Sequence, residues 1–413
     1  MQFILTVIFS DSKHQNMNGK ELQANIWKLY LIQACRWFLL LMPVLNLFYQ
    51  ENGLSLDDVF IVQAFYSICI IISEVPSGYF ADTLGRKTSM LIGAILGSIG
   101  FIIYANAYSL EQFLFAQFFI ALGTSFISGS DAALLYDTLL HLNSQEHYKK
   151  MAGKMTSVSS FSEGFAGLVG GSLALISLRT PLYCQATLMV IVIPIVLSLR
   201  EPPRCQGNET KSKWHAIIHI IQYALNENKE VKWLIIYASL VGTSTLTIVW
   251  LVQPYLLTIN WPLALYGPTW ATLQFSIALF ALLAHKIEAW LGRKLSLLSL
   301  IAISSMAYFF IGLFNNPWAG LFFFAIYFVR GVNGPVLNDY INRCVASDIR
   351  ATVLSVKNLV GRIMFTIVGP LVGIVSEHYS LSTAFLFCSS IFAFFGLLSI
   401  YFLYRNQLLT DID

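Results

Sequence analysis

Five of the ionisable side chains inside long apolar stretches of this 413-residue sequence are candidates for chemistry. Two are arginines, Arg36 and Arg330, and a guanidinium in a cavity can hold a carboxylate or phosphate through paired hydrogen bonds. Three are acids, Glu163, Asp131 and Glu74, and a buried carboxylate can take up and release a proton. These residue types therefore offer anion recognition and proton transfer. The alternative is that the arginines only pair with the acids and hold helices together.

The composition is that of a membrane protein. Hydrophobic residues make up 56% of the chain and charged residues 11%, whereas soluble domains carry roughly 25% charged residues. The net charge of +3 is small and its carriers are dispersed, which argues against nucleic-acid binding. The six cysteines are far apart, and no spacing typical of a metal site, nucleotide loop or catalytic nucleophile occurs. We therefore expect no metal, no cofactor and no enzyme activity.

The apolar stretches predict twelve membrane-spanning helices, each long enough to cross about 30 Å of hydrocarbon at 1.5 Å per residue. A span in lipid satisfies its own backbone hydrogen bonds, which favours helices over strands. The predicted spans are 25–49, 58–79, 88–107, 112–140, 152–178, 181–199, 233–259, 266–290, 295–314, 318–341, 352–377 and 382–404.

The polar stretch 200–232 divides these spans into two groups of six. The predicted organisation is a tail (1–24), a first bundle (25–199), a linker (200–232), a second bundle (233–404) and a second tail (405–413). Within the linker, apolar residues at helical spacing over 214–225 fit either an amphipathic surface helix or an ordinary helical connection. Lys and Arg outside the spans fall almost entirely on one side, and the opposite side holds only Arg179. Both tails and the linker are therefore predicted to face the cytoplasm.

A short polar turn between the second and third spans carries the most specific motif. It reads Gly-Tyr-Phe-Ala-Asp-Thr-Leu-Gly-Arg-Lys over 78–87, and Gly-Arg-Lys returns at 292–294, an offset of 207 (292 − 85). The first copy resembles the signature G-x-L-[AG]-D-x-x-G-R-[RK] of the major facilitator superfamily, from which it departs at Phe80 and Thr83. The second copy has Ala289 in place of the acid. Asp82 is expected to interact with the amino-terminal dipole of the third helix.

The resemblance implies an all-α membrane fold with two six-helix pseudo-repeats and a central cavity lined by helices 1, 4, 7 and 10. It also implies that the turn latches the ends of the two halves during transport; a turn that only fixes membrane orientation is the alternative. The expected gate residues are Gly78, Asp82, Gly85, Arg86, Lys87, Asp137, Asp339 and Arg343. Arg362 lies close enough to the predicted cytoplasmic face to be a gate or snorkelling residue. The expected substrate contacts are Arg36, Arg330, Trp250, Phe126 and Tyr327.

The fifth span has the glycine-rich run Glu-Gly-Phe-Ala-Gly-Leu-Val-Gly-Gly over 163–171. Glycines at this spacing let another helix approach closely. The run is similar to the helix 5 signature of proton-driven drug antiporters, G-x3-G-P-x2-G-G, although Ala166-Gly167 stands where Gly-Pro is expected. Proton coupling is assigned to Glu163 first, then to Asp131 and Glu74.

Together these features favour a monomeric secondary transporter in a prokaryotic inner membrane, with protons and a small organic molecule as its partners. Proton-coupled export of amphiphilic compounds is the first hypothesis. Transport of an organic anion such as a polycarboxylate chelator, in either direction, is the second, because of Arg36 and Arg330. Uptake of a neutral nutrient and a membrane-embedded sensor without turnover are the remaining alternatives.

Overall fold

In the computed structural model, residues 19–202, 222–314, 316–346 and 349–405 are described. All regular elements in these ranges are helical, as the apolar stretches predict. Residues 1–18 and 406–413 of the predicted tails, and the part of the predicted linker helix before residue 222, lie outside the described residues. Residues 19–24 of the first tail are already helical.

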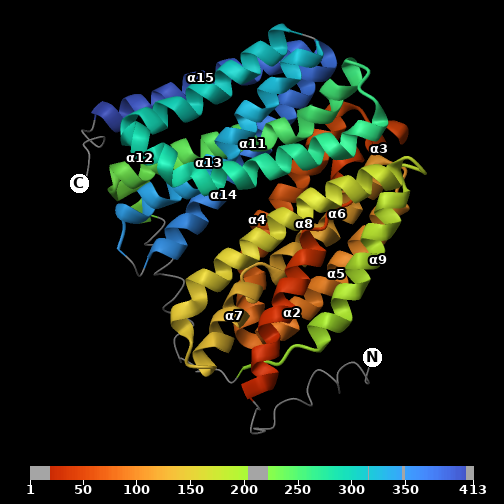
Figure 1. Cartoon of the computed structure of the whole chain (residues 1–413), viewed down its shortest axis with the longest axis vertical. Coiled ribbons are helices and arrows are strands. Elements are labelled where there is room, and N and C mark those ends of the chain that lie inside the picture. Colours follow the sequence, from red (N-terminus) through yellow and green to blue (C-terminus); the bar gives the residue numbers. More distant parts are fainter. Residues whose placement is uncertain (1–18, 203–221, 315, 347–348, 406–413) are drawn as a thin grey trace.

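Helices up to residue 197 pack into a first group (Figure 1). This group contains α2 (Gly19–Trp37), η1 (Met42–Val44), α3 (Leu45–Glu51), α4 (Leu56–Leu84), α5 (Arg86–Ala105), α6 (Leu110–Ile127), α7 (Ser130–His141), η2 (Gln145–His147), α8 (Tyr148–Ala174) and α9 (Thr180–Leu197). The second group contains η3 (Tyr223–Glu227), α11 (Lys229–Thr258), η4 (Leu263–Leu265), α12 (Tyr266–Leu313), η5 (Pro317–Leu321), α13 (Phe322–Arg343), α14 (Arg350–His378) and α15 (Leu381–Arg405).

Ten stretches of the described residues are long and apolar enough to cross a membrane. One of them, Leu263–Leu313, has 51 residues and would extend about 75 Å as a straight helix, more than twice the hydrocarbon thickness. It is broken at Gly292, where φ is +70° and ψ is 168°, so it has room for two crossings. The serine-rich α8 is not among the ten. Twelve crossings therefore remain a prediction, whereas the all-α membrane fold is confirmed.

Two predicted spans are broken into shorter helices. The span 25–49 is interrupted after Trp37, and the chain passes through η1, which contains Pro43, before α3 begins. Proline has no N–H to donate, which favours an interruption there. The span 112–140 is divided between α6 and α7 at Gly129, whose φ of +81° suits glycine. Both breaks change the direction of helices that carry the buried charges.

The two halves contact each other at one end, here called the closed end, defined by Asn46, Gln253, Gly171 and Gly267. The Asn46 backbone N–H donates to Gln253 Oε1 at 2.8 Å, and Asn46 Nδ2 donates to the Trp250 carbonyl at 2.7 Å. In return, Gln253 Nε2 donates to the Met42 carbonyl at 2.6 Å. Asn46 and Gln253 are 207 positions apart (253 − 46), the same offset as the two turn motifs. The two halves therefore meet through two side-chain amides.

Helix α8 approaches α12 backbone to backbone at the closed end. A Cβ on Gly171 would lie 2.5 Å from the Gly267 Cα, and one on Gly164 would lie 2.5 Å from the Phe275 ring. This geometry confirms that the glycine-rich run admits a close helix partner, and it identifies that partner as α12 of the other half.

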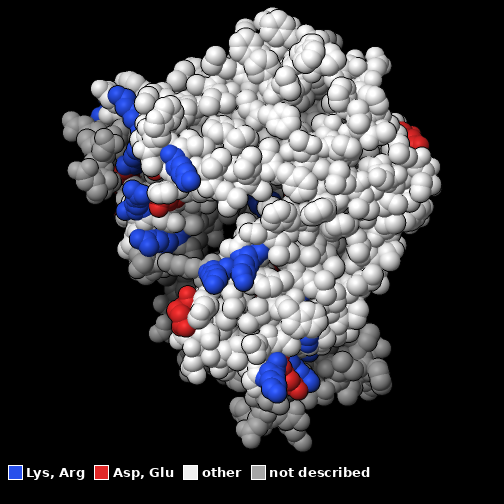
Figure 2. All heavy atoms as spheres, in the orientation of Figure 1, with Lys and Arg blue, Asp and Glu red and all other residues white. Residues whose placement is uncertain are grey.

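Charged side chains avoid the broad surface between the ends. Figure 2 shows Lys and Arg gathered at the left and lower parts of the molecule, and the surface is hollowed between the two halves on the left. Many large apolar side chains are exposed, including Trp290 (84%), Leu282 (81%) and Ile176 (76%). Lipid tails are as apolar as these side chains, so a bilayer accounts for their exposure.

Candidate functional site

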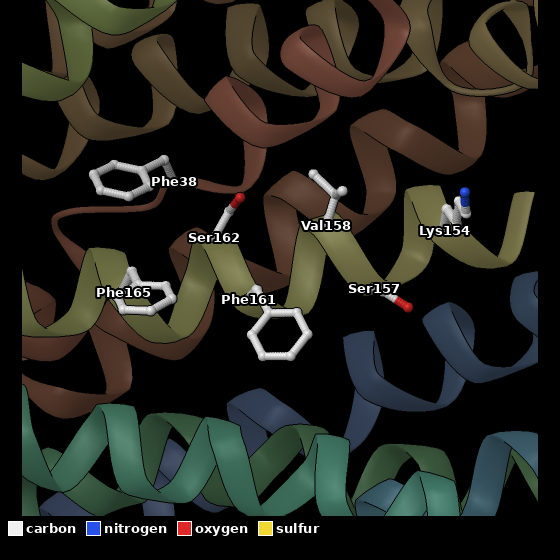
Figure 3. A pocket seen from close by; sticks show the side chains of 7 residues that line it. All are labelled: Phe38, Lys154, Ser157, Val158, Phe161, Ser162 and Phe165. Atoms are coloured by element: carbon white, nitrogen blue, oxygen red, sulfur yellow. The ribbon is translucent and has the colours of Figure 1, made fainter. Parts of the chain in front are cut away.

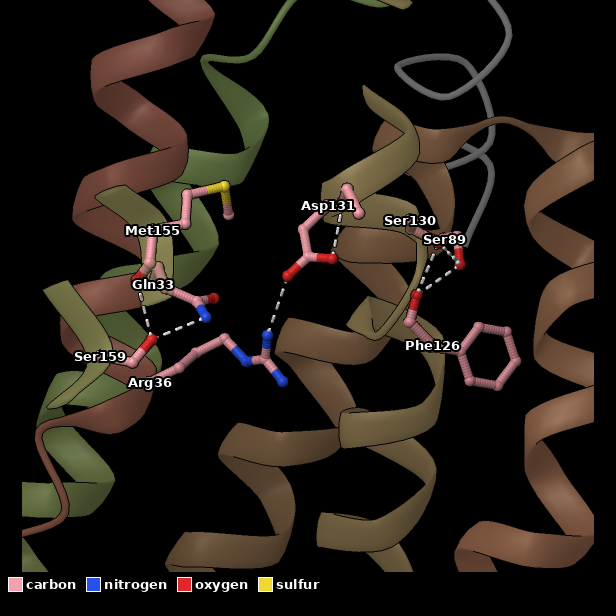
Figure 4. Close-up of polar contacts among 9 residues, drawn as sticks. Gln33, Arg36, Ser89, Phe126, Ser130, Asp131, Met155 and Ser159 are labelled. Atoms are coloured by element: carbon pink, nitrogen blue, oxygen red, sulfur yellow. Dashed lines mark hydrogen bonds and ion pairs between the residues drawn. The ribbon is translucent and has the colours of Figure 1, made fainter. Parts of the chain in front are cut away.

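Arg36 and Asp131 form an ion pair inside the first half. Arg36 is in the last turn of α2, and its Nη1 lies 3.5 Å from Asp131 Oδ2; both side chains are about 15% exposed. Asp131 is the second residue of α7, and its Oδ1 accepts the Ala132 N–H at 2.7 Å. Nearby, Gln33 Nε2 donates to the Ser159 hydroxyl at 2.9 Å (Figure 4). The helix break at Gly129 therefore directs a carboxylate towards the arginine.

A cavity of about 450 Å³ adjoins this pair. Its walls come mostly from α2, α4, α5, α6 and α9 of the first half, with Arg36, Asp131, Gln33 and Tyr66 among the polar contributors. Arg362 of α14 also lines it, and α14 belongs to the second half. The cavity is thus shared between the halves and has two guanidinium groups against one carboxylate.

A second charged cluster spans the two halves. The charge of Arg330 on α13 acts on Glu163 of α8, and the Gln274 side chain of α12 lies close enough to influence the same carboxylate. Arg330 Nη1 also donates to the Thr245 carbonyl of α11 at 2.7 Å. The charges of both Glu163 and Arg330 act on the fully buried Tyr327. The Tyr327 hydroxyl has no hydrogen-bond partner in the described structure. The cluster therefore contains one carboxyl group, one guanidinium cation and one phenol without a hydrogen-bond partner among the described residues.

The sequence did not show which acid lies near which arginine, and these two clusters do. Asp131 is the acid beside Arg36, and Glu163 is the acid beside Arg330. The third predicted coupling acid, Glu74 of α4, is exposed. Its place in proton coupling stays a prediction.

The turn at 78–87 has most of its contacts within the first half. Asp82 Oδ1 lies 2.6 Å from Arg86 Nη1, and Arg86 Nε lies 4.0 Å from Asp137 Oδ2. Gly85 links α4 to α5 with φ of +120°, which favours glycine. The first N–H groups of α5, from Arg86 and Lys87, donate to the Glu201 carboxylate at 2.8 and 2.6 Å. Glu201 therefore caps the helix dipole, and the predicted interaction of Asp82 with it stays a prediction.

The second turn, which contains Gly292 and Arg293, makes different contacts. Arg293 Nη2 lies 2.6 Å from Glu230 Oε1 of α11, and its guanidinium stacks over the Tyr340 ring at 5.3 Å. Glu288, one position from the missing acid, accepts a hydrogen bond from the Tyr340 hydroxyl at 2.9 Å. At the end of α13, Asp339 and Arg343 form an exposed ion pair of 2.7 Å. Their role in gating stays a prediction, as does that of Gly78 and Lys87.

The predicted aromatic contacts lie apart from one another. Trp250 is 8% exposed at the closed end, and its indole N–H has no partner in the described residues. The Phe126 ring points away from the Arg36–Asp131 pair (Figure 4) and packs on Phe80 at 5.8 Å. Tyr327 is with Glu163 and Arg330. In this conformation, Arg36 is the predicted substrate contact that lines the 450 Å³ cavity.

Another cavity of about 430 Å³ follows one side of α8. Phe38, Lys154, Ser157, Val158, Phe161, Ser162 and Phe165 line it (Figure 3). Phe161 and Phe165 also approach Phe275 of α12, with ring centroids 6.5 and 5.7 Å apart. This hollow is largely apolar, so it offers an amphiphile a surface but few groups for recognition.

Several polar residues that line a cavity or contact another helix are absent from the predicted substrate and coupling residues. They are Arg362, Gln274, Glu201, Gln253 and Lys357, whose Nζ donates to Asn338 Oδ1 at 2.8 Å. Four of them are polar residues inside apolar stretches, and this pattern could have indicated them from the sequence. Nothing in the sequence around Glu201 indicates its contact with the turn. In the part of the chain that the structure describes, no group of three His, Cys, Asp or Glu could hold a metal ion.

The ion pair of the turn yields a prediction for Asp82→Asn. The pair is partly exposed, so folding should lose no more than about 1 kcal/mol. Transport should nevertheless slow several-fold, because Arg86 is released to other acids such as Asp137 and the turn changes its partners. Transport rate and labelling of cysteines introduced at both ends of the molecule would measure this. Glu146→Gln, which neutralises an exposed acid outside the turn, is the matched control. If folded Asp82→Asn protein shows wild-type transport and labelling, the turn does not act as a latch.

Comparison with known sequences places this geometry in context. Residues 27–369 match the Major Facilitator Superfamily. The chain is 22% identical over 354 residues to the MFS-type transporter YxaM of Bacillus subtilis, covering 83% of this chain and 86% of YxaM. It is 24% identical over 166 residues to the quinolone resistance protein NorA of Staphylococcus aureus, covering 40% of this chain and 42% of NorA. The NorA match therefore spans less than half of either protein.

Known structures share the overall fold. A point mutant of the nucleoside transporter NupG superposes with a TM-score of 0.78 at 17% identity, covering 94% of this chain and 100% of NupG. A bacterial homologue of the lysosomal transporter Spinster, in an inward-facing and unoccupied conformation, gives a TM-score of 0.76 at 15% identity, covering 95% and 98%. At these identities the likeness shows the fold alone.

Proposed function

Since this chain belongs to the major facilitator superfamily and is a membrane transporter rather than an enzyme, we propose that it exports a small amphiphilic molecule in exchange for protons. The observation that supports the proton coupling is the electrostatic interaction between Glu163 on α8 and Arg330 on α13, across the boundary between the halves. A transporter that alternates between two conformations must change contacts at this boundary. An acid whose partner lies on the other half is therefore placed to respond to that motion.

The proton step follows from electrostatics. Burial among apolar helices disfavours the ionised Glu163 carboxylate, and the positive charge of Arg330 opposes that effect while the two residues face each other. When the halves move and the Arg330 charge is withdrawn, the neutral acid is favoured further. The two conformations therefore differ in how strongly Glu163 holds its proton. Gln274 on α12 can hydrogen-bond the side chain in either form.

Export is favoured over import by two modest observations. The glycine-rich run over 163–171 is similar to the helix 5 signature of drug antiporters, and part of the chain is similar to a quinolone resistance protein. Uptake of a neutral nutrient remains the alternative. The protein is proposed to act as a monomer in a bacterial inner membrane, with both tails and the linker on the cytoplasmic side, where Lys and Arg accumulate.

Proton flux measured in proteoliposomes tests this proposal. The purified protein is first screened by thermal shift against amphiphilic cations, anions and neutral compounds, since a ligand of the folded state raises its apparent stability. A stabilising compound is then added to liposomes that contain a pH-sensitive dye. We expect substrate-dependent proton movement that a protonophore abolishes. Equilibration of the compound without proton movement would instead identify a facilitator.

A further inference from the structure

We propose that the 450 Å³ cavity binds an organic anion, one carboxylate or phosphate head on an apolar body, between Arg36 of α2 and Arg362 of α14. This names the substrate class and rests on the proposed transport function. The two arginines come from different halves and line the same cavity. The geometry therefore brings two cations to one site that neither half forms alone.

Arg362 is the residue that requires an explanation. It lies twelve residues after the first residue of α14, which corresponds to about 18 Å along the helix. Apart from the backbone hydrogen bonds of the helix, its carbonyl accepts the Thr366 hydroxyl at 2.9 Å. In the described part of the chain its guanidinium pairs with none of the acids. A charged side chain within a span faces a cavity or pairs with a partner, because the membrane interior disfavours it. The cavity provides the first condition, and an anion would provide the second.

Arg36 also retains unused donors. Its Nη1 makes the single contact with Asp131 at 3.5 Å, and a guanidinium has five N–H groups. Counting Arg36, Arg362 and Asp131, the cavity has two positive charges and one negative charge. Asp131 therefore offsets one arginine and leaves one positive charge for a ligand. Arg330 has a different role, because it already faces Glu163.

The remaining walls suit an apolar body rather than a second charge. They include the aromatic and aliphatic residues Trp37, Phe101, Ile127, Met189 and Val192. Hydroxyls come from Tyr66, Thr124 and Ser128. The volume is within the range of about 300–1,000 Å³ typical of small-molecule sites. An amphiphilic monoanion matches these walls better than a polycarboxylate, which would need further cations.

The sign of the cavity can be tested without knowing the ligand. In the full chain with its six cysteines replaced by serine, Ser128→Cys places a thiol at the cavity wall. Anionic and cationic methanethiosulfonates of similar size are then compared. We expect the rate ratio, anionic over cationic, to fall about three- to tenfold when Arg362→Gln is added. Arg405→Gln, at the exposed end of α15, is the matched control and should leave the ratio unchanged. An unchanged ratio in Arg362→Gln would overturn the proposal.

Binding of matched probes tests the substrate class. Thermal shift of the purified chain is measured with para-butylbenzoate, para-butylbenzamide and para-butylbenzylammonium, which differ mainly in charge. We expect the benzoate to bind best, with its affinity reduced about ten- to hundredfold by Arg362→Gln and less by Arg362→Lys. Equal binding of all three, preference for the cation, or no binding of the benzoate would overturn the anion assignment. Proton-driven transport of a cationic compound would show that the assignment fails while the proposed function stands.

Discussion

Glu163→Gln is expected to abolish gradient-driven transport, with a loss of about a hundredfold or more, while substrate binding persists. Glutamine keeps the length and hydrogen-bonding capacity of the side chain, so the contact with Gln274 can be retained. It cannot be protonated or carry the charge that faces Arg330. Loss of a proton-transfer group typically costs about 10²–10⁴-fold in the step it serves. Uptake into proteoliposomes under an imposed pH difference, alongside thermal-shift binding, measures both quantities.

Two further variants make the Glu163 test specific. Glu111→Gln removes an exposed acid at the start of α6 and should leave coupling unchanged. Asp131→Asn removes the partner of Arg36 and should change substrate affinity more than coupling. Accumulation of substrate by Glu163→Gln against its gradient, with only a pH difference imposed, would show that this acid is not the essential proton carrier.

Gly171→Ala is expected to open the closed end. The new Cβ would lie 2.5 Å from the Gly267 Cα, a distance that only backbone movement can relieve. Overpacking of this kind typically costs about 1–3 kcal/mol, which corresponds to roughly a five- to 150-fold shift between conformations. The population with its closed end separated should therefore rise. Labelling of a cysteine introduced beside the Asn46–Gln253 contact would report the shift, and transport should fall with it.

The same helix supplies the control for this variant. A Cβ on Gly153 of α8 would meet nothing within 4 Å, so Gly153→Ala adds the same methyl group without a clash. Its labelling and transport should match those of the wild type. If Gly171→Ala keeps the wild-type labelling pattern, the backbone contact between α8 and α12 does not hold the closed end together.

The motifs predicted local features well, and they failed where the partner lies elsewhere in the chain. The polar turn at 78–87 does contain an Asp82–Arg86 pair, since the two residues are only four positions apart in the sequence, across the break at Gly85. However, the cap of the next helix comes from Glu201, which is more than a hundred positions away. The substrate prediction shows the same division. Arg36 lines the cavity, Arg330 faces an acid, and Arg362, expected near a gate, is the second cavity arginine.

The sequence by itself determined that this is an all-α membrane protein, where its apolar stretches lie, and that its fifth span permits a close helix contact. Those properties depend on hydropathy, helical repeat and the absence of side chains, which are local. Only the tertiary structure decided that Asp131 belongs to Arg36 and Glu163 to Arg330, and that Asn46 meets Gln253. Such pairings depend on how each helix is rotated, and on breaks such as that at Gly129. Packing between distant segments sets both.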